Sequence, residues 1–166
     1  TGTMLIPFYD QIHQVGVDVQ YTTGAWLWKF EGLAREGQGE PFGAFVGGFE
    51  YTLYQIFESD ADLGLLSELL YDGRDPGGAP PTAFDNDLFL GARLALNDVQ
   101  DTSVLGGTVI DLVDGTTSFR VEAERRLGDA WKLGVEIQFV AHAAADNLLA
   151  TLDQDGFILL RLSWFY

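Results

Sequence analysis

Cysteine is absent from this chain, and basic residues are scarce. Without cysteine there is no disulfide scaffold, no thiolate metal site and no cysteine nucleophile. Nine lysine and arginine residues stand against 25 aspartate and glutamate residues, and the formal net charge is −16. We therefore expect no nucleic-acid partner, because neutralising phosphates needs clustered basic side chains.

Long apolar runs are missing as well. No segment approaches the roughly 18 residues that a membrane helix needs. No secretory signal peptide is visible at the start of the sequence, so a secreted form would be mature, trimmed or partial here. Yet 47% of the 166 residues are hydrophobic and 13% are aromatic. So much apolar surface in so acidic a chain must be spread over short segments.

Those short segments alternate apolar and polar residues, which is the period of a β-strand. The first clear one places Val15, Val17, Val19 and Tyr21 on one face. The expected strands cover residues 14–21, 26–31, 42–57, 63–72, 88–96, 103–112, 119–124, 131–139 and 157–166. Residues 63–72 also fit a helix, but their short length and strand neighbours favour a strand. The facing of 103–112 cannot be fixed from its sequence.

The lengths of the connections favour a membrane barrel. Long connections are expected at 34–41, 73–86 and 141–156, and short ones at 22–24, 58–62, 97–101 and 127–129. Bacterial outer-membrane barrels have short periplasmic turns and longer external loops. The turn at 113–116 is the exception, because it is short and would lie outside. The sequence predicts an all-β fold, an antiparallel up-and-down transmembrane β-barrel with nine to ten strands, in one domain over 1–166.

Aromatic residues gather toward the ends of the strands that meet the short connections. Such rings settle at a membrane–water interface. The expected interface residues are Tyr21, Trp26, Trp28, Trp131, Trp164 and Tyr166. A soluble barrel or sandwich is the alternative, and it would have to bury the terminal Trp-Phe-Tyr in its core.

The opposite face of the alternating segments is charged. The residues expected to line the lumen are Asp18, Lys29, Glu31, Glu50, Glu68, Arg93, Arg120, Glu122, Glu124, Lys132, Glu136 and Arg161. A three-residue turn at 127–129 would pair Glu124 with Lys132 and Arg120 with Glu136. A four-residue turn at 22–25 would pair Asp18 with Lys29. Opposite charges that face each other across strands help to fix the register.

Several phrases resemble the C-terminal part of poorly characterised proteobacterial outer-membrane β-barrel (porin-like) proteins. They are Gly24-Ala-Trp-Leu-Trp-Lys-Phe-Glu31, Gly48-Phe-Glu-Tyr51, Leu69-Leu-Tyr-Asp72, Ala95-Leu-Asn-Asp98 and Glu124-Arg-Arg-Leu-Gly-Asp-Ala-Trp-Lys-Leu133. The alternating end, Phe157 to Tyr166, looks like the closing strand by which barrel-assembly machinery recognises such proteins. The resemblance implies the bacterial outer membrane, with its lipid and lipopolysaccharide as partners, and it supplies no catalytic residues.

The expected number of strands bears on whether this sequence contains the whole barrel. Single-chain bacterial barrels have an even number of strands, so nine strands leave one unaccounted for. Either residues 3–9 form a short tenth strand, or the barrel includes earlier strands or other subunits outside this sequence. Pro7 favours the second reading, since proline interrupts strand pairing.

Candidate chemistry is sparse. His13 and His142 would both lie on the external side, and Ser103, Ser118 or Ser163 could act as a nucleophile, but no Gly-x-Ser-x-Gly motif is present. The acidic pairs Asp60/Asp62 and Asp153/Asp155 could hold calcium, but their spacing does not match an EF-hand loop.

We expect no enzyme, cofactor or metal. The expected function is a porin-like passive channel; the alternatives are a non-conducting anchoring barrel and, third, an outer-membrane enzyme.

Overall fold

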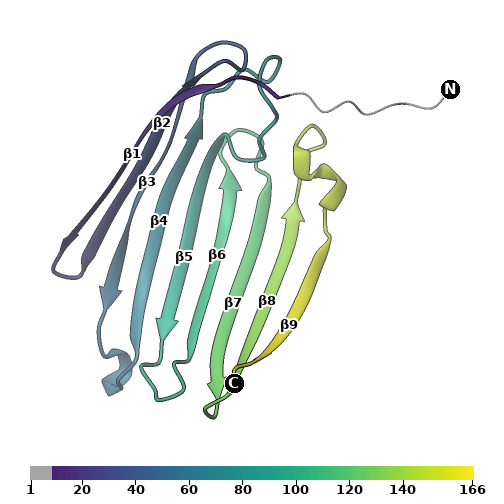
Figure 1. Cartoon of the computed structure of the whole chain (residues 1–166). Helices are drawn as coiled ribbons and strands as arrows, with labels where there is room; N and C mark the ends of the chain where they lie inside the picture. Colours follow the sequence, from purple (N-terminus) through teal and green to yellow (C-terminus); the bar gives the residue numbers. More distant parts are fainter. Residues whose placement is uncertain (1–8) are drawn as a thin grey trace.

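Nine β-strands form one antiparallel sheet in which every strand pairs with its neighbours in sequence (Figure 1). The computed structural model describes residues 9–166. The strands are β1 His13–Thr23, β2 Trp26–Glu36, β3 Phe42–Leu53, β4 Asp62–Asp72, β5 Asn86–Ala95, β6 Ser103–Asp111, β7 Thr117–Leu127, β8 Trp131–His142 and β9 Gly156–Trp164. Two 3-10 turns, η1 Ile56–Glu58 and η2 Leu148–Leu152, lie in the connections. Neither is long and apolar enough to cross a membrane.

The expected all-β, up-and-down architecture is confirmed, and residues 62–72 form a strand rather than a helix. The sheet curves but does not close. β1 and β9 are its two edges, and each has a single strand neighbour among the described residues. The tenth strand expected at residues 3–9 falls almost entirely on residues 1–8, which lie outside the described residues.

The connections alternate between the two ends of the sheet (Figure 1). Those at 37–41, 73–85, 112–116 and 143–155 lie at the end where β1 begins; those at 24–25, 54–61, 96–102 and 128–130 lie at the other. The two longest share the first end, as expected. The predicted long loop at 34–41 is wrong in extent, because β2 continues to Glu36 and leaves a short connection.

Two predicted hairpin registers are wrong by two residues. The β1–β2 turn is only Gly24-Ala25, so Asp18 lies opposite Glu31 and not Lys29. The β7–β8 turn is 128–130, so Glu124 lies opposite Gly134 and not Lys132. Gly24 and Gly128 have φ of +57° and +66°, a conformation that glycine adopts without strain. A shift of two residues keeps every side chain on its predicted face, because the strand period is two.

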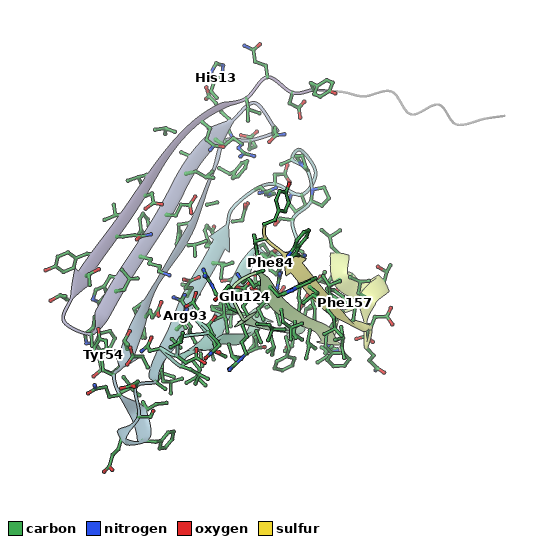
Figure 2. All side chains as sticks on the ribbon, turned by 60° about the horizontal axis from the view of Figure 1, so that its bottom comes forward. His13, Tyr54, Phe84, Arg93, Glu124 and Phe157 are labelled. Atoms are coloured by element: carbon green, nitrogen blue, oxygen red, sulfur yellow. The ribbon has the colours of Figure 1, made fainter. Side chains whose placement is uncertain are left out.

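The pairing gives the sheet two chemically distinct faces. One face, here called the apolar face, includes Val19, Phe30, Leu69, Leu88 and Ile110 along one line of paired residues. The other, here called the charged face, lies inside the curve, and Figure 2 shows Arg93 and Glu124 directed toward the hollow. The best-buried strand residues lie on the charged face: Phe42, Glu50, Leu66, Asp87, Asp111 and Val140.

The strands are staggered around the sheet. A line of directly paired residues from Tyr21 passes through Trp28 and Phe49 and ends at Gly156. It therefore starts near the end of β1, eight residues after His13, and finishes at the first residue of β9. Over the eight steps from β1 to β9, the stagger is one residue per strand.

Candidate functional site

All twelve residues predicted to line a lumen lie on the charged face. Within one strand these residues are separated by an even number of positions, and between strands the lines of directly paired residues place them on the same face. Asp18, Glu31, Glu122, Glu136 and Arg161 each stand sixth in their strands. These five side chains therefore lie near mid-length of the sheet, and all twelve residues together are here called the belt.

Ion pairs connect neighbouring strands within this belt. Arg120 contacts both Glu122 and Glu136, and its guanidinium lies 3.0 Å from the Glu136 carboxylate. The Lys132 ammonium lies 2.7 Å from the Glu124 carboxylate. Both inter-strand pairs were predicted, but they form diagonally across the ladder and not between directly opposite residues. Long side chains reach a diagonal neighbour across antiparallel strands, so the pairs survive the change in register.

Two other ion pairs span an intervening strand. The Lys29 ammonium on β2 reaches across β3 to Glu68 on β4, at 3.9 Å. Gly48 lies between them in the same line of paired residues, and a Cβ there would come within 2.7 Å of the Glu68 Cα. A glycine is thus required for close approach at this point.

The second spanning pair has the same construction. The Arg93 guanidinium on β5 lies 3.5 Å from the Glu50 carboxylate on β3, with Gly64 of β4 between them. A Cβ at Gly64 would lie 2.6 Å from a Glu50 carboxylate oxygen. The Glu50 side chain is only 11% exposed, so Arg93 compensates a largely desolvated charge.

A small hollow interrupts the charged face between β7, β8 and β9. Its volume is about 240 Å³, and Glu122, Glu136, Gly134 and Arg161 contribute to its lining. Gly134 lies directly between Glu124 and Arg161 in the pairing, so no side chain fills the space. The hollow is open and lined by charge, and it suits water and small ions better than an apolar ligand.

The predicted interface aromatics lie on the opposite, apolar face, and they contact one another in two groups. Trp26 stacks on Trp28, with ring centroids 5.4 Å apart, and contacts Tyr51 at 4.6 Å. Trp131 contacts Trp164 at 6.2 Å, and Trp164 contacts Tyr166 at 5.4 Å. Tyr21 is paired directly with Trp28. All lie toward the end of the sheet that has the turns 24–25 and 128–130.

Sequence reasoning missed a second acidic feature on the charged face. Asp87 and Asp111 are directly opposite each other on β5 and β6, and they are 2% and 6% exposed. Asp111 accepts hydrogen bonds from the backbone N–H groups of Val113 and Asp114, whereas one oxygen of Asp87 has no hydrogen-bond partner among residues 9–166. Asp87 lies two residues before Phe89 and six before Arg93, and this even spacing was the available signal for its face. Its partner could not be predicted, because the facing of residues 103–112 was unknown.

The other candidate groups have structural roles or stand apart. Asp62 accepts hydrogen bonds from Gln55 and Asn97, and Asp153 from the Ala143 backbone. Within residues 9–166 no group of three or more acidic or histidine side chains is arranged to hold a metal ion. His13 and His142 lie on β1 and β8, with six strands between them. Ser103 and Ser163 lie at the opposite end of the sheet from both histidines, and the backbone carbonyl of Ser118 accepts a hydrogen bond from the Thr108 hydroxyl.

The loop between β5 and β6 is fixed by one carboxylate. Asp98 accepts hydrogen bonds from the backbone N–H and the hydroxyl of Thr102, at 2.7 and 2.8 Å, and lies 3.2 Å from the Arg125 guanidinium. The backbone hydrogen bond from Thr102 is the main cause that lowers the pKa of Asp98 below its ordinary value. Its role is to brace the loop.

Comparison with known proteins identifies no match: no family model, no curated protein and no solved structure is similar to this chain. The chemistry of the two faces of the sheet is therefore the basis for assigning a function.

Proposed function

We propose that this chain forms the wall of a β-barrel in the bacterial outer membrane, and that the barrel is a porin-like passive channel for ions or small solutes. The single observation behind the proposal is the division of the sheet into an apolar face outside the curve and a charged face inside it. Transmembrane barrels have this arrangement, with lipid outside and a polar interior.

The exposed apolar surface supports a lipid environment. Leu65, Leu90 and Phe119, on strands inside the sheet, remain 44%, 42% and 46% exposed. Since they extend over the whole sheet, water would meet a contiguous apolar surface that soluble monomers rarely show. The tryptophan and tyrosine rings at one end fit the boundary between hydrocarbon and water.

The stagger of the strands also suits a barrel wall. One residue per strand, at about 3.3 Å per residue and about 4.8 Å between strands, corresponds to a tilt of about 35°. Strands of nine to twelve residues would then cover about 24 to 32 Å along the barrel axis. The apolar band of outer-membrane barrels is about 25 Å tall, so the strands have a suitable length.

The two open edges are where further strands would join. β1 and β9 run in the same direction, because an odd number of antiparallel strands separates their ends. Antiparallel closure would therefore take an odd number of additional strands. In this proposal the β9 edge, with the aromatic end of the chain, is also the segment that barrel-assembly machinery engages, and lipopolysaccharide and lipid surround the apolar face.

A non-conducting barrel that anchors a membrane complex is the second candidate. The ion pairs inside the curve favour this anchoring barrel, because they hold side chains together. They join Arg120 to Glu122 and Glu136, and they reach across β3 and β4. In a narrow barrel such a network fills the interior. The number of strands that complete the wall decides between a filled and a water-filled interior.

Planar-bilayer recording distinguishes the two candidates. The protein is purified in mild detergent, in the form in which the outer membrane holds it, and is added to a bilayer in potassium chloride. The channel predicts stepwise conductance increases that scale with salt concentration. Correctly folded, membrane-inserted protein without conductance steps would contradict the channel and favour the anchoring barrel.

A further inference from the structure

We propose that the conduction path along the charged face prefers cations to anions, and that carboxylates outside the ion pairs produce this preference. The inference rests on the proposed channel function and names the class of solute that the channel passes. It invokes no bound ion. It concerns the fixed charge of the wall.

Ion pairs occupy most of the basic groups of the belt. Lys29, Arg93, Arg120 and Lys132 each lie within 4.0 Å of at least one carboxylate. Their charges are compensated locally, and Arg120 faces two glutamates. In the described part of the chain, Arg161 is the base of the belt that makes no ion pair.

One acidic pair of the belt has no such basic partner among the described residues. Asp18 and Glu31 lie directly opposite each other on β1 and β2, and both residues are exposed. The base nearest in the pairing, Lys29, turns away toward Glu68 on β4. Within residues 9–166 no lysine or arginine forms an ion pair with either carboxylate. Like charges directly opposite are unfavourable, and mobile cations relieve the repulsion.

The charged face as a whole carries a net negative charge. Its acidic residues in the strands are Asp18, Glu31, Glu50, Asp62, Glu68, Asp72, Asp87, Asp111, Glu122, Glu124 and Glu136. Its basic residues there are Lys29, Arg35, Arg93, Arg120, Arg126, Lys132 and Arg161. The acidic groups outnumber the basic ones, in line with the net charge of −16 for the chain.

Fixed charges on a low-dielectric wall raise the local concentration of counter-ions, and rings of carboxylates favour cations in channels. Because Asp18, Glu31, Glu122 and Glu136 lie near mid-length of their strands, their charges act along the path and not only at its mouth. Salt screens this effect over about 10 Å at 0.1 M and about 3 Å at 1 M. The preference should therefore be strong at low salt and weak at high salt.

The test is the reversal potential in a tenfold potassium chloride gradient, measured on the protein as the outer membrane holds it. We expect the sign that indicates potassium permeation. The double variant Asp18→Asn/Glu31→Gln should lower the potassium-to-chloride permeability ratio by about twofold or more. The control Glu58→Gln/Asp60→Asn removes the same charge from the 54–61 connection and should leave the ratio unchanged.

Each outcome has a distinct meaning. Conductance with a reversal potential near zero, or of the sign for chloride, overturns the cation preference while the channel function stands. An equal ratio for the double variant and the native protein overturns the role of Asp18 and Glu31. Inserted protein without any conductance overturns the channel function and the cation preference together.

Discussion

Two adjacent leucines in the middle of β9 provide a direct test of which face meets lipid. Leu160 lies on the apolar face opposite Val135, and Leu159 lies on the charged face opposite Glu136. They share the same residue type, the same strand and nearly the same depth. The variants Leu159→Lys and Leu160→Lys therefore differ mainly in the side of the sheet on which the ammonium is placed.

The expected magnitudes differ by several kcal/mol. A lysine on the lipid face near the middle of an outer-membrane barrel costs about 2 to 4 kcal/mol, and Leu160 stands fifth among the nine residues of its strand. This corresponds to a folding equilibrium lowered by about 30-fold to 900-fold. The lysine at position 159 would instead meet water and Glu136, and an exposed pair of this kind contributes at most about 1 kcal/mol in its favour.

Reversible unfolding by urea in lipid vesicles measures this difference, and the fluorescence of the four tryptophans reports the transition. We expect the midpoint of Leu160→Lys to fall well below that of the native protein and the midpoint of Leu159→Lys to remain close to it. Equal midpoints for the two variants, or a larger loss for Leu159→Lys, would refute the assignment of the apolar face to lipid.

Three further predictions concern stability. Arg93→Met should cost about 1 to 3 kcal/mol, because it leaves the Glu50 carboxylate desolvated and without its base; adding Glu50→Gln should recover part of the loss in a urea double-mutant cycle. Gly48→Ala should cost about 1 to 3 kcal/mol, since its Cβ would meet the β4 backbone, whereas Gly134→Ala should be mild because its nearest neighbour would lie 3.7 Å away; equal midpoints would contradict this. The pKa of Asp98 is lowered in the folded state by its loop hydrogen bonds, so its stabilisation is present above about pH 4 and is lost as the pH falls through the folded value. The variant Asp98→Asn should therefore be less stable at neutral pH and lose less stability on acidification, and thermal melts between pH 3 and pH 7 would show parallel curves if this reasoning were wrong.

Strand positions and facing were predictable because they depend on local information. The alternation of Val15, Val17 and Val19 with polar neighbours needs no partner to be recognised. Residues 62–72 formed a strand despite leucines at helical spacing, since the sheet supplied neighbours on both sides. The weak strand 103–111 was different. Its facing became clear only through pairing with β5 and β7.

Register was less predictable, because it depends on where a turn begins. Moving the β7–β8 turn by one residue, to 128–130, placed Glu124 opposite Gly134. The sequence around each turn glycine does not show at which residue the turn begins. The ion pairs that reach over Gly48 and Gly64 were also beyond sequence reasoning, because they join strands that are not adjacent in the sheet.

The sequence by itself determined the period of two, the charged and apolar identities of the two faces and the aromatic residues at one end. These properties depend only on the residues of each segment, so a strand has them whatever its neighbours are. Only the tertiary structure decided which carboxylates are compensated by a base and which are not. Compensation by a base depends on contacts between strands. Asp18 lies opposite Glu31, whereas the sequence had predicted Lys29 at that position. The open edges at β1 and β9 likewise emerged only from the assembled sheet, because strand direction and pairing are properties of the whole ladder.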